Sequence, residues 1–274
     1  MKRLIYSLII LSTLMFACSI SVTGTPPVVT APPVVTAPPV VTVPPVVTVP
    51  PITVNVICNE LSLFLDPALA SGYDCITEPA VTEGPEVKPQ STNLTLQGYV
   101  LSDKFFTPHI SVFSVPAYSG LLPDFVPGHV SDLQTLIGGG AAGESLPLLP
   151  SFGAAQIFHA QYQMIPFVSG GGIRYLTEYA QYFAPINNHD LFYTYQGLTS
   201  DGNYWVSAIL PINNPVLPAN GDNPPGGVSW EQFSNNYDPY ITDIIDQLNS
   251  QTSDSYIPTL TALDALVASI TIQP

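Results

Sequence analysis

Residues 154–212 read AAQIFHAQYQMIPFVSGGGIRYLTEYAQYFAPINNHDLFYTYQGLTSDGNYWVSAILPI, and this stretch decides the fold. Apolar and polar residues alternate along it in separate runs, which is the pattern of strands that bury one face. Clusters of Gly, Pro, Asn and Asp divide the runs, and these residues favour turns. The stretch therefore predicts consecutive antiparallel strands at Phe158–Phe167, Ile173–Phe183, Leu191–Gln196 and Tyr204–Leu210.

Two turns of this predicted meander have a clear chemical reason. Ser169–Gly172 is expected to make the first turn, because glycine reaches positive φ without a steric clash. Asp201-Gly202 is expected to close the last hairpin, because these residue types favour tight turns.

Weaker patterns flank the meander. Alternation predicts further strands at Leu61–Leu65, Leu94–Leu101, His109–Val115 and Ser269–Ile272, the last returning to the sheet. Helical spacing predicts helices at Val130–Ile137, at Trp230–Ser234, from an N-cap at Asp238 to Leu248, and after Pro258. The predicted fold class is therefore α+β: an antiparallel β-sheet, made of a four-strand meander plus extra strands, packed with a few helices in a single domain.

The N-terminus has the pattern of a targeting signal. Lys2-Arg3 precedes an apolar segment, Leu4–Ala17, which is shorter than the about 20 residues that span a bilayer. Ala17-Cys18 resembles the site at which bacterial lipoprotein signals are cleaved before a cysteine that becomes diacylated, although Met15 and Phe16 depart from the usual residues. We therefore expect a signal peptide at 1–17, lipidation of Cys18 and a place on the extracytoplasmic side of a bacterial membrane. An ordinary secretory signal is the alternative.

A proline-rich repeat follows the cysteine. Residues 26–54 repeat PPVVTA and PPVVTV and end in PPITVN. Paired prolines fix φ and remove amide donors, so polyproline II is the expected conformation. We interpret residues 18–54 as a lipid-anchor site and stalk, and residues 55–274 as a globular α+β domain.

The cysteine count supports an exported protein. Setting Cys18 aside leaves one pair, Cys58 and Cys75. A disulfide is the simplest expectation outside the cytoplasm, where thiols oxidise. Two buried free thiols are the alternative.

Charge and motifs exclude several functions. The chain carries 20 acidic and 5 basic residues, so nucleic-acid binding is not expected, and membrane attachment should come from the lipid alone. The histidines, at 109, 129, 159 and 189, lack metal-ligand spacing. Gly138–Ser145 lacks the Lys-Ser/Thr of a phosphate-binding loop, and no nucleophile elbow occurs. The sequence therefore predicts no cofactor, no metal and no catalytic residue.

Alternation divides the meander into two phases. One phase is expected to pack under helices: Phe158, Tyr162, Met164, Leu191, Tyr193, Tyr195, Tyr204, Val206 and Leu210. The other carries His159, Gln161, Gln163, Phe192, Thr194, Gln196, Trp205 and Ser207, and we expect Arg174 and Glu178 to join it. Its candidate ligand-binding residues are His159, Arg174, Glu178, Gln196 and Trp205, because amides, charges and an indole suit carbohydrates or peptides. A solvated face, a face covered by the N-terminal segment, or a structural ion pair of Arg174 with Glu178 or a neighbour are the alternatives.

The segments GIRYLTEYAQYFAPINN and YTYQGLTSDGNYWVSAILP, within Gly172–Pro211, resemble the core of uncharacterised exported bacterial lipoproteins over roughly residues 59–274. That resemblance implies a lipid signal, a low-complexity stalk and a β-meander, with no activity attached. The layout is also distantly similar to the PsbP/Mog1 type of α/β/α sandwich, in architecture alone. We expect a lipid-anchored module that binds a ligand or partner. A secreted hydrolase with a non-local active site, or a structural subunit of an envelope complex, are the alternatives.

Overall fold

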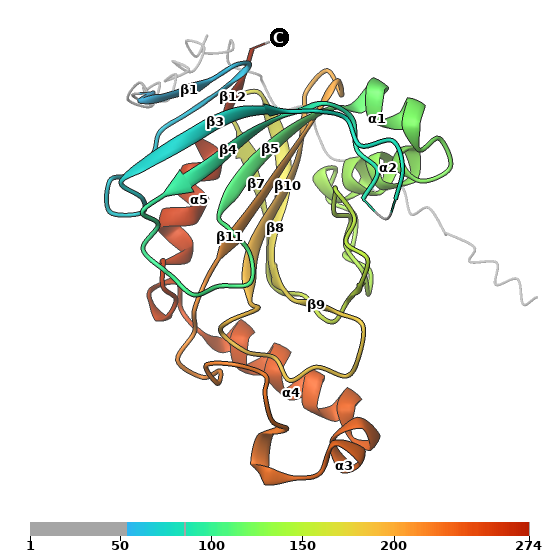
Figure 1. Cartoon of the computed structure of the whole chain (residues 1–274), viewed down its shortest axis with the longest axis vertical. Coiled ribbons are helices and arrows are strands. Elements are labelled where there is room, and N and C mark those ends of the chain that lie inside the picture. Colours follow the sequence, from blue (N-terminus) through green and yellow to red (C-terminus); the bar gives the residue numbers. More distant parts are fainter. Residues whose placement is uncertain (1–53, 85, 274) are drawn as a thin grey trace, which may run out of the picture. The chain divides into compact units, whose positions relative to one another are not determined.

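The four strands of the meander form one side of a seven-stranded antiparallel sheet and include one of its edge strands (Figure 1). The computed structural model describes residues 54–84 and 86–273. The sheet has the order β3-β4-β5-β11-β10-β8-β7, so the strands of the meander are direct neighbours. Its strands are β3 (Gly72–Glu78), β4 (Ser91–Gln97), β5 (His109–Ser114), β7 (Ala160–Phe167), β8 (Gly170–Thr177), β10 (Phe192–Thr199) and β11 (Tyr204–Pro211). The predicted α+β class is confirmed.

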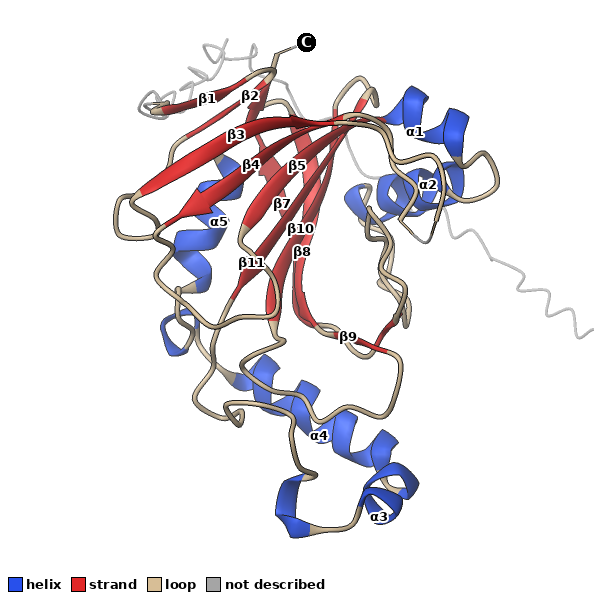
Figure 2. Ribbon diagram, viewed as in Figure 1, coloured by secondary structure: helices blue, strands red, loops and turns tan. Residues whose placement is uncertain are grey.

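Two smaller sheets and a set of helices surround this sheet (Figure 2). The smaller sheets are β1-β2-β12, made of Val56–Cys58, Leu61–Leu63 and Thr271–Ile272, and β6-β9, made of Ala155–Gln156 and Tyr179–Ala180. The α-helices are α1 (Val115–Leu121), α2 (Val126–Ile137), α3 (Trp230–Asn235), α4 (Tyr237–Ser250) and α5 (Leu260–Ala268); short 3₁₀ turns lie at Pro225–Gly227 and Ser253–Ser255. The last strand therefore does not return to the large sheet as predicted, because β12 pairs with β2.

The two faces of the large sheet bury different cores. On the face that we call the α5 face, Tyr193, Tyr195 and Val206 pack with α5 and with the β1-β2-β12 sheet. On the opposite face, which we call the α2 face, Ile173, Tyr175 and Trp205 pack with residues of α1 and α2. The predicted split of β10 and β11 into two phases is confirmed, because Tyr193, Tyr195, Val206 and Leu210 share one cluster while Trp205 belongs to the other. The second phase is covered rather than solvated.

A bulge in β7 overturns part of the predicted pattern. The register between β7 and β8 shifts between Ala160 and Gln163, where Gln161 has a φ of 54°. The extra residue reverses the alternation. As a result Tyr162 packs on the α2 face and Met164 is 46% exposed, whereas Ile165 and Phe167 enter the core in their place.

The glycine triplet of the meander has a different role from the one expected. The turn consists of Val168 and Ser169, and Gly170–Gly172 begin β8. A Cβ at Gly172 would lie 2.5 Å from the Gln196 carbonyl oxygen and 2.6 Å from the Tyr195 ring. The glycine is therefore needed for close packing beneath an aromatic ring, not for a turn. The predicted strand Ile173–Phe183 is also too long, because β8 ends at Thr177 and Tyr179–Ala180 pairs with β6.

The helix starts follow local capping chemistry. Ser229 caps α3 in a capping box with Gln232, and Thr259 caps α5. Asp238 is not the N-cap of α4, because the helix already begins at Tyr237 after Asn236.

Cys58 and Cys75 form a disulfide with a Cα–Cα distance of 5.5 Å. The bond joins β1 of the small sheet to β3, the outermost strand of the large one. The predicted signal peptide, Cys18 and all of the proline-rich stalk except its last residue, Val54, lie outside the described residues. Among the helices that the structure describes, none has the length and apolar character needed to cross a membrane.

Candidate functional site

A row of neutral polar side chains crosses the α2 face. Gln196 on β10 opposes Ser207 on β11, which opposes Ser111 on β5, which opposes Asn93 on β4. All of them are less than 8% exposed. Polar side chains placed under cover in this way need hydrogen-bond partners, so the partners at each end of the row show which end is closed.

The Gln196 end of the row is closed and satisfied. Its amide nitrogen donates to Ser207 Oγ at 2.9 Å and to Thr194 Oγ1 at 2.8 Å. Its amide oxygen accepts from Trp205 Nε1 at 2.7 Å and from the Leu149 backbone N–H at 3.1 Å. Gln196 and Trp205, both predicted as ligand-binding residues, are therefore 0% exposed and bonded to each other beneath the loop that carries Leu149.

The Asn93 end of the row opens into a cavity of about 700 Å³, which we call the sheet cavity. Its floor is formed by Asn93, Thr95, His109 and Ser111 of β4 and β5. Asn93 donates to Ser111 Oγ at 3.1 Å and accepts from Thr95 Oγ1 at 3.1 Å. Each of these groups keeps hydrogen-bonding capacity for a bound molecule, since an amide and a hydroxyl can each make further bonds.

Aromatic rings form one wall of the sheet cavity. They come from three separate segments: Phe105 and Phe106 before β5, Phe152 in the loop before β6, and Tyr179 in β9. Phe106 stacks on Phe152 at a centroid distance of 5.0 Å, and Phe152 meets Tyr179 edge-on at 4.9 Å. Phe105 is 66% exposed, so its ring presents an open surface at the cavity mouth.

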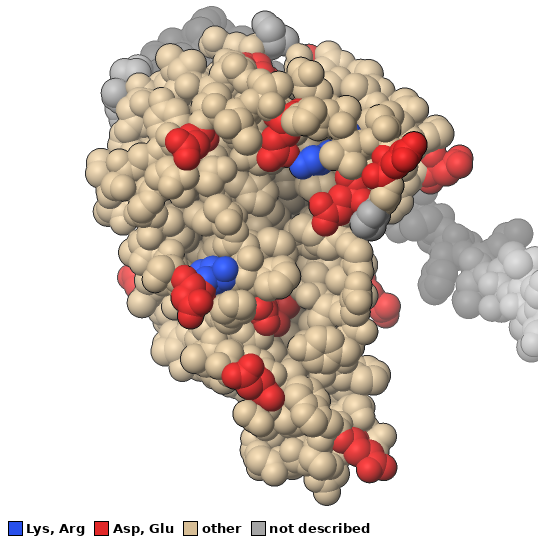
Figure 3. All heavy atoms as spheres, in the orientation of Figure 1, with Lys and Arg blue, Asp and Glu red and all other residues tan. Residues whose placement is uncertain are grey.

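Charge is confined to the rim of this cavity. Lys88 forms an ion pair with Glu78, and Glu86 lies beside them. Burial lowers the pKa of His109, although the Thr107 carbonyl, 2.8 Å from Nδ1, opposes the shift, so its ring is neutral at neutral pH. Acidic side chains are scattered over the visible face of the molecule, where basic ones are few (Figure 3). The site therefore offers neutral polar contacts inside and a net acidic surrounding.

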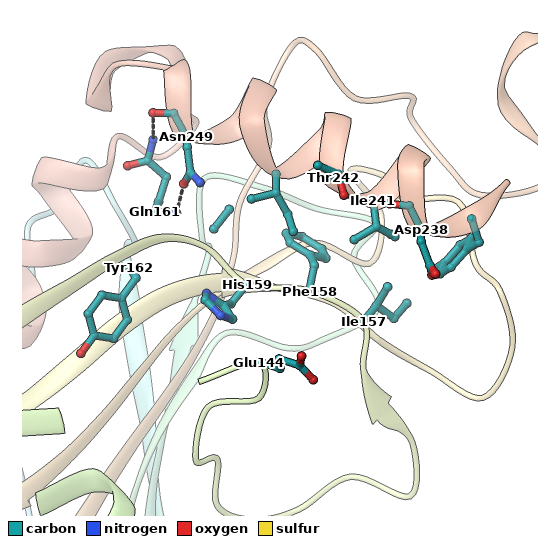
Figure 4. Close-up of a pocket in the computed structure, with 13 residues that line it drawn as sticks. Glu144, Ile157, Phe158, His159, Gln161, Tyr162, Asp238, Ile241, Thr242 and Asn249 are labelled. Atoms are coloured by element: carbon teal, nitrogen blue, oxygen red, sulfur yellow. Dashed lines mark hydrogen bonds between the residues drawn. The ribbon is translucent and has the colours of Figure 1, made fainter. Parts of the chain in front are cut away.

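A second cavity, of about 550 Å³, lies between α4 and the start of β7 (Figure 4). It contains His159, predicted as a ligand-binding residue, with Glu144 across the opening and Phe158, Ile241 and Asp238 along one side (Figure 4). His159 Nε2 lies 3.0 Å from the Gly143 carbonyl oxygen. The bulged Gln161 is tied to α4, because its backbone N–H donates to Asn249 Oδ1 at 2.6 Å.

Arg174 does not share a face with the other predicted residues. It opposes Tyr195 in the register, which places it on the α5 face. Its guanidinium contacts the Gln161 carbonyl, donates to Gln163 Oε1 at 2.8 Å and pairs with Asp264 of α5 at 3.3 Å. The pKa of Asp264 is raised by burial, and Arg174 opposes that shift. Arg174 therefore fastens α5 to the sheet, and the expectation that it joins the Trp205 face is wrong.

Glu178 lies beyond the end of β8 and is 1% exposed. Its carboxylate accepts a hydrogen bond from the Asn187 backbone N–H at 2.7 Å. Burial raises its pKa well above the usual carboxyl range, and the nearby Asp190 acts in the same direction. In the described part of the chain it has no ion pair with Arg174, whose pairing partner is Asp264. The structural ion pair expected for Arg174 is therefore made with another neighbour, Asp264, and not with Glu178.

The structure does not bring the five predicted binding residues into one site. Trp205 and Gln196 are buried at the closed end of the polar row, beside the sheet cavity, His159 lines the second cavity, and Arg174 and Glu178 are buried elsewhere. Sequence reasoning missed the residues that line the sheet cavity, although His109 and Ser111 lie in a strand that it did predict. Within residues 54–84 and 86–273, no cluster of His, Cys, Asp and Glu is arranged to hold a metal ion.

Comparisons with protein-family models, with curated proteins and with solved structures found no match to this chain. The resemblance to exported lipoproteins therefore stays a prediction from sequence, and function is argued from the geometry of the cavities.

Proposed function

We propose that this chain is a lipid-anchored, extracytoplasmic module that binds a neutral carbohydrate in the sheet cavity. The observation that carries the proposal is the polar row of the α2 face. At Gln196 the row is closed, and the side-chain amide has hydrogen-bond partners at both its nitrogen and its oxygen. At Asn93 and Ser111 the row opens into the sheet cavity beside a wall of aromatic rings. The lipid anchor and the location come from the sequence pattern around Cys18.

The chemistry of the cavity matches that of a sugar. A sugar ring has hydroxyl groups around its edge and C–H groups on its faces. The amide of Asn93 and the hydroxyls of Thr95 and Ser111 can exchange hydrogen bonds with hydroxyls. The rings of Phe105 and Phe152 can pack against an apolar ring face. A concave site with a few placed polar groups and aromatic walls is the usual form of a small-ligand site.

The excess of acidic residues argues against an anionic ligand. The two basic residues of the targeting segment are Lys2 and Arg3, so the chain from Cys18 onward has 20 acidic and 5 − 2 = 3 basic residues. At the cavity rim the positive charge of Lys88 is already opposed by Glu78, and Glu86 adds a further negative charge. An acidic saccharide or a phosphorylated ligand would therefore be repelled on approach.

The hydrogen-bond partners of the histidines favour a binding function over hydrolysis. The hydrogen bonds of the His109, His129 and His159 rings go to backbone carbonyls, and His189 bonds to Asp190. A hydrolase that used histidine as its base would need contact with a hydroxyl or thiol nucleophile instead. The polar floor and aromatic wall of the sheet cavity support binding instead.

The test is saccharide binding by the full-length protein. Cellotriose, chitotriose and maltotriose are suitable neutral probes, and thermal stabilisation and calorimetry are suitable measurements. We expect at least one probe to bind, and we expect Phe105→Ala and Thr95→Val to weaken that binding at least tenfold. Phe183→Ala is the matched control, because Phe183 is also a half-exposed phenylalanine (54%) but lies outside the sheet cavity. Failure of all neutral probes, or equal losses in the control, would contradict the proposal.

A further inference from the structure

The second cavity continues into a third. The third cavity has a volume of about 710 Å³ and lies beside β6, β9 and the start of α4. It shares Ile157, Tyr237 and Asp238 with the 550 Å³ cavity of Figure 4. The two cavities therefore form one continuous groove between α4 and residues 153–162, which we call the α4 groove.

One end of the α4 groove carries exposed aromatic rings. Tyr182 is 65% exposed and Phe183 54% exposed, and both line the groove. Trp230 at the start of α3 is 46% exposed and meets Tyr182 edge-on at 6.5 Å. Phe183 in turn packs on Tyr237 at 4.9 Å. Large rings are rarely left exposed side by side on a protein surface without a binding role.

The groove and its surroundings are acidic. Glu144 and Asp238 line it on opposite sides. The segment 213–250, which supplies α3 and α4, has no Lys, Arg or His, and its acidic residues are Asp222, Glu231, Asp238, Asp243 and Asp246. Carboxylates next to aromatic faces attract ammonium and guanidinium groups, through ion pairing and through cation–π contact.

The shape of the groove favours an extended chain as its occupant. Its base alternates between apolar side chains such as Ile157, Ile241 and Ile245 and the polar groups of His159 and Thr242. Gly153–Ile157, which includes β6, runs along it, and in the described part of the chain β6 pairs on one side only, with β9. A strand with one free edge can receive the backbone hydrogen bonds of an extended polypeptide.

We propose that the α4 groove is a docking site for an extended polypeptide segment that carries Lys or Arg between apolar residues. The cationic groups lie against Asp238, Glu144 and the exposed rings, and the apolar side chains fill the base over Ile157 and Ile241. This site is separate from the sheet cavity and goes beyond the proposed carbohydrate binding.

The test uses three labelled decapeptides and the full-length protein. The first alternates Lys with Leu, the second replaces each Lys with Gln, and the third replaces each Lys with Glu. We expect the Lys peptide to bind at least tenfold more tightly than the Gln peptide, and the Glu peptide to bind more weakly still. Equal affinity for the Lys and Gln peptides overturns the proposal.

Location is tested with a charge-matched pair of variants on the same helix. Asp238→Asn and Asp246→Asn each remove one exposed carboxylate from α4, but only Asp238 lines the groove. We expect a loss of affinity of at least fivefold for Asp238→Asn and of less than twofold for Asp246→Asn. Equal losses would show attraction to the net charge alone and would overturn the site.

Tryptophan fluorescence gives an independent reading of the place of binding. The chain has two tryptophans; Trp205 is 0% exposed and Trp230 46% exposed, so acrylamide quenches Trp230 preferentially. The bound Lys peptide should reduce this quenching at least twofold. Binding without protection of Trp230 overturns the docking of the peptide at the aromatic end.

Discussion

The two faces of the large sheet are formed by the same strands but differ in what they bury. On the α5 face, the side chains of β4, β5, β10 and β11 form one continuous apolar core beneath α5 and the small sheet. On the α2 face, the core under α1 and α2 gives way to the polar row that ends in the sheet cavity. Because alternation assigns successive residues to opposite faces, one face can provide stability while the other is free to carry polar groups.

Trp205→Ala should produce the largest loss of stability, because it removes a buried side chain from the closed end of the α2 face. The side chain is fully buried, and its loss leaves a cavity and removes one donor from Gln196. We expect the free energy of unfolding to fall by about 3–5 kcal/mol, measured by urea denaturation with circular dichroism. Trp230→Ala is the control and should change stability by less than about 1 kcal/mol, because Trp230 is half exposed. Equal effects at the two tryptophans would contradict the assignment of Trp205 to a buried, closed core.

Removal of the disulfide tests how much the cross-link at the edge of the α5 face contributes to stability. The double variant Cys58→Ala, Cys75→Ala opens a loop with a sequence separation of 17. We expect a loss of about 3 kcal/mol, because the cross-link limits the freedom of the unfolded chain. Unfolding of the wild type in reducing buffer should show the same loss. A reduced wild type as stable as the oxidised protein would refute the expected contribution.

Glu178→Gln should alter the pH dependence of stability rather than abolish folding. The raised pKa means that the folded protein holds this proton to a higher pH than the unfolded chain does. Wild-type stability should therefore decrease as pH rises above the usual carboxyl range, by at most about 1.4 kcal/mol per pH unit from this group. The glutamine variant, which can still accept the hydrogen bond from Asn187, should lose that slope between pH 5 and pH 8. Glu83→Gln, at an exposed position, should keep the wild-type slope.

Phe105→Ala should have the smallest effect on stability. The ring is 66% exposed at the mouth of the sheet cavity, so the free energy of unfolding should change by about 0.5 kcal/mol or less. The same change is expected to weaken carbohydrate binding at least tenfold. A large loss of stability would show that the open end of the α2 face is a structural core like the closed end.

The regular part of the sheet could be predicted from the sequence, and the irregular part could not. β10 and β11 alternate without interruption, and Asp201-Gly202 lie between them with Gly202 at a φ of 73°. The β7 bulge gives no such signal, because nothing in its composition marks Gln161 for positive φ. The edge strand β3 was missed, since its GYDCITE has no residue buried enough to form an apolar face.

The candidate site was harder to predict than the fold because distant segments build it. The sheet cavity joins β4, β5, the loop at Phe105–Thr107 and the loop at Pro150–Ala154. Periodicity identifies which residues of one strand share a face, but it does not say which loop covers that face. Trp205 and Gln196 were therefore assigned to the correct face of the sheet, whereas their burial depends on Leu149, 47 residues before Gln196.

The bond between Cys58 and Cys75 also has a mechanical consequence. Tension applied through the residues before β1 would act first on this three-residue strand, which pairs with β2 and could be peeled from it one hydrogen-bonded pair at a time. Peeling stops at Cys58, because there the load passes through a covalent bond to β3 and is then carried by the full length of its seven paired residues with β4. A tether attached on that side would pull on a cross-linked sheet instead of unzipping the domain from its first strand.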